Sequence, residues 1–204
     1  MPAPALYSSA SELQYTPADI LERARYLFGG SIDLDPASDY EANKTVRAKR
    51  YYTQADDGLI RPWGCFSLWL NPPFTIDKLY PDGTPVLSER TGKPIRERVI
   101  DRWVARWCAA TDLSKLDPND EHDAPEACTA LLLIPARTDT QWFRPLWGSH
   151  MCFIEGRLHY SGSKAGAPFP SVLVYRGPHI ARFYMLFDDV GECGTFCKQV
   201  PALG

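Results

Sequence analysis

The chain has 204 residues, of which 45% are hydrophobic and 23% are charged, a composition that favours a folded globular protein and excludes a disordered one. The formal net charge of −3 excludes a strongly basic, histone-like nucleic-acid binder. No run approaches the roughly 20 apolar residues that a membrane helix needs, and the first residues lack the pattern of a secretory signal. We therefore expect one cytoplasmic domain over residues 1–204, with six reduced cysteines whose spacing predicts no metal site.

The first predicted element is a helix that follows a tail of residues 1–15. Thr16 is a candidate N-cap, Pro17 fits the first helical position, and Gly29-Gly30 can end the helix. The apolar residues at helical spacing are Ile20, Leu21, Ala24, Leu27 and Phe28.

Strand and helix patterns alternate over the next part of the chain. Residues 31–35 alternate like a short strand, a turn leads into a second helix over about 39–48, and 49–53 fit another short strand. Residues 66–70 form a clear apolar strand, and the prolines that follow it prevent its continuation.

Two long loops, 75–95 and 113–127, flank a predicted helix whose apolar stripe runs from 99 to 108. Residues 130–134 are continuously apolar, as in a buried strand of a parallel sheet. Asp139 is a candidate cap of a short helix that ends near Pro145. Three further strands are predicted over 151–154, 172–175 and 181–187.

This order predicts an α/β fold with a mostly parallel sheet, helices on both faces and a strand-rich C-terminal half. Ligands bind such sheets beyond the carboxyl ends of the strands.

The segment Asn71-Pro72-Pro73-Phe74 stands at such an end. The Asn71 side-chain oxygen and the Pro72 carbonyl are two acceptors, and consecutive prolines fix the backbone that carries them. Phe74 adds an aromatic face. The group suits a planar ring with an exocyclic amine, because each acceptor can take one of its hydrogens. The alternative is a purely structural turn with Phe74 in the core.

This tetrapeptide matches the (D/N/S)PP(Y/F/W) motif of amino-methyltransferases that use S-adenosylmethionine. The chain resembles the phage-type, Dam-like DNA N6-adenine methyltransferase family over most of its length. The segments that carry the resemblance are 15–17, 33–38, 51–59, 70–74, 134–143, 153–160 and 167–171.

The resemblance implies a class I methyltransferase, Rossmann-like fold and methyl transfer from S-adenosylmethionine to N6 of adenine in double-stranded DNA, after base flipping. By the family motif, Asn71 and the Pro72 carbonyl would bind the target amine and Phe74 would stack on the base. It also implies a bacterial host cell, a phage or prophage gene and a role of the restriction-modification kind.

The resemblance further implies a cofactor site that includes the strand-one loop. Asp33 to Ser38 occupies the place of that loop but lacks its usual glycines, and an Asp35 carboxylate would suit the ammonium group of the cofactor. The predicted cofactor-binding residues are Tyr15, Thr16, Pro17, Asp33, Asp35, Pro36, Ala37, Ser38 and Asp57. Helix capping by Thr16 and Asp35, and a turn at Asp57, are the structural alternatives.

Basic and polar residues downstream of the motif are candidate DNA contacts, with a solvated surface as the alternative. They are Lys93, Arg96, Arg137, Thr138, Gln141, Arg157 and Lys164. Since a small chain leaves little room for a recognition domain, we expect a short or relaxed recognition sequence, read by 75–95 and 156–170.

Two other functions fit the same residues. One is an amino-methyltransferase with another substrate: cytosine N4, RNA or a protein glutamine. The other is an inactive DNA-binding module, against which the intact Asn71-Pro72-Pro73-Phe74 argues.

Overall fold

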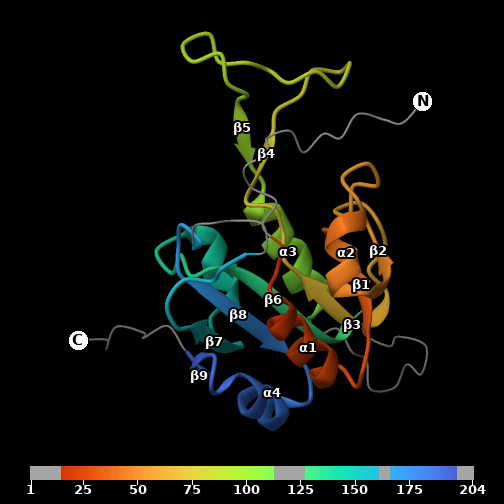
Figure 1. The fold of residues 1–204 in the computed structure, drawn as a ribbon, viewed down its shortest axis with the longest axis vertical. Helices are drawn as coiled ribbons and strands as arrows, with labels where there is room; N and C mark the ends of the chain where they lie inside the picture. The colour runs from red at the N-terminus through yellow and green to blue at the C-terminus, as the bar shows by residue number, and fades with distance from the viewer. Residues whose placement is uncertain (1–14, 113–126, 161–165, 197–204) are drawn as a thin grey trace.

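The computed structural model describes residues 15–112, 127–160 and 166–196, which form a seven-stranded sheet in the order β2-β1-β3-β6-β8-β7-β9 (Figure 1). Neighbouring strands are parallel from β2 to β6 and antiparallel from β6 to β9. The strands are β1 (Ile32–Asp35), β2 (Ala48–Tyr51), β3 (Cys65–Leu70), β6 (Ala127–Pro135), β7 (His150–Ile154), β8 (Ser171–Arg176) and β9 (Gly191–Thr195).

Helices cover both faces of this sheet, as predicted. On one face, α3 (Ile100–Ala110) and the 3-10 helix η2 (Gln141–Leu146) pack on a core that includes Leu132 of β6. On the other, α1 (Ala18–Leu27) and α4 (Ile180–Phe187) pack on a core that includes Leu131. Successive residues of a strand point to opposite faces, so β6 contributes to both cores.

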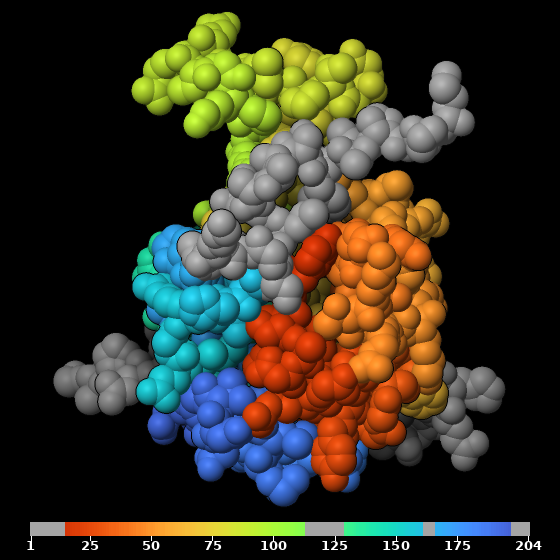
Figure 2. Space-filling model, in the orientation of Figure 1, coloured from red at the N-terminus to blue at the C-terminus, as the bar shows by residue number. Residues whose placement is uncertain are grey.

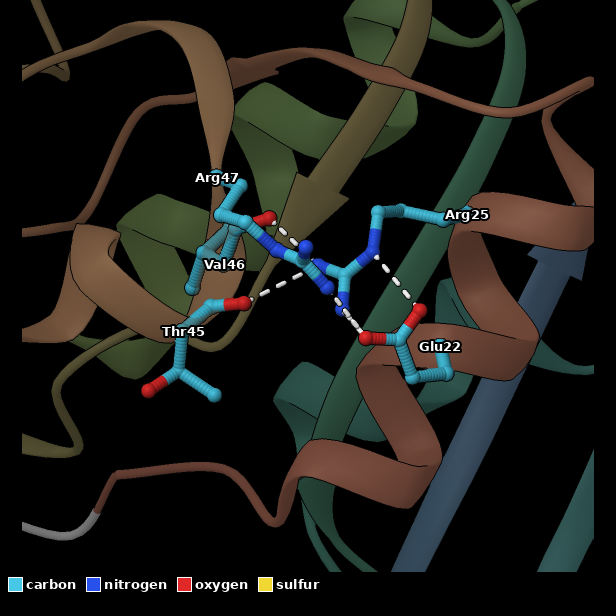
Figure 3. Close-up of polar contacts among 5 residues, drawn as sticks. All are labelled: Glu22, Arg25, Thr45, Val46 and Arg47. Carbon is cyan, nitrogen blue, oxygen red and sulfur yellow. Dashed lines mark hydrogen bonds and ion pairs between the residues drawn. The ribbon is translucent and has the colours of Figure 1, made fainter.

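The short helix α2 (Tyr40–Val46) is fixed to α1 through a buried arginine (Figure 3). Arg25 of α1 is 7% exposed and donates to the Thr45 and Val46 carbonyls at 2.9 and 2.8 Å. These are carbonyls of the last turn of α2, which have no partner within the helix. Glu22 forms ion pairs with both Arg25 and Arg47. The C-terminal end of α2 is therefore held by α1.

The start of α1 differs from the prediction. Pro17, not Thr16, is the N-cap residue, and no side chain caps this helix. The Thr16 hydroxyl instead accepts a hydrogen bond from the side chain of Asn71, which follows β3, so a tertiary contact replaces the local cap. The predicted end is confirmed, because Gly29 and Gly30 have φ of 80° and 113°, which favour glycine.

Asp139 does not cap η2 either. Its carboxylate pairs with Arg137 at 3.0 Å, and Thr140 precedes the helix without a capping hydrogen bond. Pro145 lies inside η2, which ends one residue later at Leu146, near its predicted end.

The strand predicted over 181–187 is wrong, because these residues belong to α4. Phe183 and Phe187, four residues apart, are fully buried, and Met185 between them is exposed. That spacing is helical, although the aromatic content resembles a strand. The strand that does occur in this region is β9, which pairs with β7 at the sheet edge.

Residues 75–95 are not a plain loop. β4 (Thr75–Asp77) pairs with β5 (Arg96–Arg98), and the chain between them makes two further bridged turns. We call residues 75–98 the arm; it projects from the body of the molecule (Figures 1 and 2). Arg96 lies in β5 of the arm, before α3 begins at Ile100. The predicted loop 113–127 lies outside the described residues but for Ala127, which begins β6.

In the part of the chain that the structure describes, every helix is too short or too polar to pass through a bilayer.

Candidate active site

A cavity of about 380 Å³ lies beyond the carboxyl ends of β1, β3 and β6. Asp35 ends β1, Asn71 follows β3, and Pro135 ends β6; Ser171 begins the antiparallel β8 at the same edge. Parallel strands bring their carboxyl ends to one edge of the sheet, so residues far apart in sequence meet there.

The four residues Asn71 to Phe74 all line this cavity. Phe74 packs edge-on against Trp142, with ring centroids 6.1 Å apart, and its carbonyl accepts from the Val99 amide at 3.1 Å. The turn after β3 is thus fixed by the start of α3 and by η2. Asn71, Pro72 and Phe74 are thereby held around one space.

The segment before α1 meets this turn. The Asn71 Nδ2 atom donates to the Thr16 hydroxyl at 3.1 Å, and both Thr16 and Tyr15 line the cavity. The contact joins Thr16, a predicted cofactor-binding residue, to Asn71, a predicted catalytic residue.

Asp35 is buried, with 3% of its surface exposed. Burial raises the pKa of its carboxyl group to about 7, against the opposing effects of hydrogen bonds from the Ala37 amide and from Ser38. The Ala37 amide lies 3.1 Å from Oδ1, whereas the Ser38 hydroxyl is nearby but has no well-aligned partner among the described residues. This corner of the cavity offers polar groups that the protein itself does not saturate.

Gln54, like Ser38, has a buried polar atom without a hydrogen-bond partner among the described residues. This atom is its side-chain oxygen, and the residue lines the cavity. Such an acceptor favours a ligand that brings a donor.

The loop after β1 has no glycine, yet it packs closely against one. A Cβ on Gly58 would lie 1.9 Å from the Pro36 carbonyl oxygen. The close backbone approach that is common in a glycine-rich loop is provided here by a glycine across from it.

Five of the predicted cofactor residues line the cavity: Tyr15, Thr16, Asp35, Ala37 and Ser38. Pro17 and Pro36 flank this set without lining the cavity.

Two predicted aspartates lie elsewhere. Asp57 has φ of 51° in a turn, where its carboxylate accepts from the Leu59 amide at 3.2 Å. Asp33 pairs with Lys49 at 2.7 Å and lines a separate cavity of about 430 Å³ with Phe66, at the opposite end of the strands.

The predicted DNA contacts are divided between the arm and the cavity edge. Arg96 lies at the base of the arm, lines the cavity and is 3.5 Å from Asp77. Arg137 lies over the Phe169 ring at 5.1 Å, and Arg157 donates to the Pro168 carbonyl at 2.9 Å.

The other predicted contacts, Lys93, Thr138 and Gln141, are exposed. Lys164 lies outside the described residues.

Sequence reasoning missed Gln54, Tyr160 and Phe169, which also line the cavity. Gln54 lies in a polar run that carries no signal. Phe169 stands between two prolines, a rigid arrangement that could have marked it.

The family model described as DNA N-6-adenine-methyltransferase (Dam) matches residues 5–169 of the chain. No curated protein and no solved structure matches it.

Proposed function

The chain belongs to the Dam family of DNA N-6-adenine-methyltransferases, and we propose that the cavity at the carboxyl ends of β1 and β3 is its active site. The family match confirms the predicted fold class, the S-adenosylmethionine cofactor and methyl transfer to N6 of adenine in DNA. One observation supports the site above all: Asn71, Pro72 and Phe74 share a cavity with the buried polar groups of Asp35 and Gln54.

The residues at the Asp35 end of the cavity fit S-adenosylmethionine. The cofactor carries an ammonium group and ribose hydroxyls, which are donors. Asp35 offers a carboxylate, which also accepts from the Ala37 amide, and Gln54 offers an acceptor that the described residues leave without a partner. When bound, the cofactor supplies the methyl group. Asp35 binds the ammonium group in its ionised form, because an opposite charge nearby offsets the burial that otherwise raises its pKa.

At the other end, the Asn71 oxygen and the Pro72 carbonyl hold the two hydrogens of the adenine amine. The lone pair of that nitrogen is delocalised into the ring, so the free amine is a poor nucleophile. Two fixed acceptors favour the geometry in which the lone pair is localised, and they stabilise the positive charge that develops as the nitrogen is methylated. Phe74 stacks on the base.

The target adenine leaves the DNA helix to reach this cavity, because its amine is inaccessible inside the stacked duplex. The arm starts directly after Phe74 and projects past the cavity, so it can contact the DNA on either side of the target. It carries Lys78, Arg90, Lys93, Arg96 and Arg98, together with exposed Tyr80, Leu87 and Ile95. Cationic groups bind phosphates, and apolar groups contact bases or sugars.

The test is transfer of tritiated methyl groups from S-adenosylmethionine to unmethylated duplex DNA. Asn71→Ala is expected to lower kcat at least 100-fold with the same thermal unfolding temperature, because one acceptor for the amine is lost. Phe66→Ala is the control, because Phe66 lines the separate cavity and is 76% exposed. The kcat of this variant should match that of the unchanged protein. Full activity of Asn71→Ala, or loss only in Phe66→Ala, would place the site elsewhere.

A further inference from the structure

We propose that Thr16 is a positioning residue that sets the orientation of the Asn71 amide, so that its oxygen faces the adenine amine. The proposal rests on the active site proposed above. It gives Thr16 a task in catalysis that is separate from its predicted role in binding the cofactor.

An asparagine side chain has two nearly isosteric ends, an oxygen that accepts and an NH2 group that donates. Rotation by 180° about the Cβ–Cγ bond exchanges them. The target amine presents hydrogens, so only the orientation with the oxygen toward it is productive. In the other orientation two donors face each other, and the Pro72 carbonyl remains the only acceptor of the pair.

The hydrogen bond of Asn71 is the one that the proposal requires. Nδ2 of Asn71 donates to the Thr16 hydroxyl at 3.1 Å, and within the described residues Oδ1 accepts no hydrogen bond although Asn71 lines the cavity. The amide therefore has its donor end occupied and its acceptor end available.

Thr16 is well placed for this task. It is 5% exposed, and its hydroxyl caps no helix, because Pro17 is the N-cap of α1. A residue that precedes proline is restricted to extended backbone, and a β-branched side chain has few rotamers, so the hydroxyl has few available positions. A hydroxyl can also donate to an amide oxygen, so the orientation is set when a group bound in the cavity, which Thr16 also lines, accepts the Thr16 proton and leaves only lone pairs for the amide.

Thr16→Val tests the inference because it keeps the shape and removes the hydroxyl. We expect kcat to fall at least 10-fold, with a KM for DNA and a Kd for S-adenosylmethionine within 2-fold of the unchanged protein. Thr16→Ser restores the hydroxyl and should recover most of the lost kcat. Thr195→Val is the matched control: this hydroxyl is also hydrogen-bonded, to His150 and Tyr184, but on the distant strand β9. It should not change kcat.

The decisive measurement repeats Thr16→Val in an Asn71→Asp background, which the family motif permits. A carboxylate has two equivalent oxygens and no orientation to set. The loss of kcat caused by Thr16→Val should therefore shrink to less than 3-fold.

An equal loss in both backgrounds, or a loss confined to cofactor binding, would overturn the positioning role. So would an unchanged kcat in Thr16→Val. Each of these outcomes is distinct from failure of the proposed site, which would appear as full activity of Asn71→Ala.

Discussion

At Asp35 the cost of burying a carboxyl group opposes the role that we propose for it. Its carboxyl group lies in a buried corner that favours the neutral form, and its pKa is raised to about 7. A cationic ligand needs the ionised form. Under the proposed function, the folded protein therefore holds a group whose charge is unfavourable until the cofactor binds, and perturbed pKa values of this kind are common at binding sites.

The pH dependence of stability follows from this shift. Between about pH 4 and pH 7 the folded protein retains a proton on Asp35 that the unfolded chain, with a pKa near 3.8, has lost. The contribution of Asp35 to the free energy of unfolding therefore falls as pH rises through this window and is level on either side.

We expect Asp35→Asn to remove this decline and to be the more stable protein above pH 7, by an amount on the order of a few kcal/mol at most. Its affinity for S-adenosylmethionine should fall at least 10-fold, since the charge partner is lost. Urea unfolding at pH 5 and pH 8, with calorimetric titration of the cofactor, measures both effects. A stability difference that is the same at the two pH values would contradict the assignment.

Among the elements, those with an unambiguous local pattern agree with prediction. β3 and β6 are continuous apolar runs, and α1 and α3 carry apolar stripes at helical spacing. The Asn71-Pro72-Pro73-Phe74 turn was predictable too, because two prolines after an apolar strand leave little choice.

The predictions that were wrong have a common cause, because tertiary contacts outweigh local sequence signals at these positions. Residues 180–187 have strand-like composition, but burial of Phe183 and Phe187 on one face selects a helix. β9 contains two glycines and forms only because β7 offers an edge to pair with. Likewise the hydroxyl of Thr16, a suitable cap in isolation, is used by Asn71.

The contact between α1 and α2 gives a prediction at this scale. Arg25→Met keeps an unbranched side chain but leaves the Thr45 and Val46 carbonyls without their donor. We expect a loss of about 2–3 kcal/mol in the free energy of unfolding, because buried hydrogen bonds to a charged group are lost. Arg47→Met is the control: Arg47 also pairs with Glu22 but is exposed, so its loss should stay below about 1 kcal/mol. Chemical denaturation compares the two, and equal losses would show that the Thr45 and Val46 contacts contribute little.

At the scale of the whole molecule, the body and the arm are separate in space. The body holds the cavity between the strand ends and the covering helices, and the arm projects from it (Figure 2). The buried residues of both cores lie outside the arm. The sheet order and both helical layers are therefore independent of most arm residues.

This separation predicts that the arm can be shortened. The Lys78 amide donates to the Ile95 carbonyl at 2.8 Å, so a two-residue Asn-Gly turn can replace residues 79–94 and keep the β4–β5 ladder. We expect an unchanged unfolding temperature and cofactor Kd, with DNA binding weakened at least 10-fold. Fluorescence anisotropy with labelled duplex DNA measures the binding, and a variant with the same DNA affinity would exclude the arm as a contact.

The position of the arm within the parallel pair β3–β6 has an evolutionary consequence. The arm is part of the connection between β3 and β6, whose two ends must come together when the strands pair. The entropic cost of closing such a connection grows only with the logarithm of its length. Doubling such a connection costs about 0.6 kcal/mol. Insertions, deletions or exchange of the arm are therefore cheap for folding, whereas changes at the strand ends are not. Under the proposed role of the arm in DNA contact, lineages of this family can diverge in the DNA they prefer while the Asn71-Pro72-Pro73-Phe74 turn a few residues upstream stays the same.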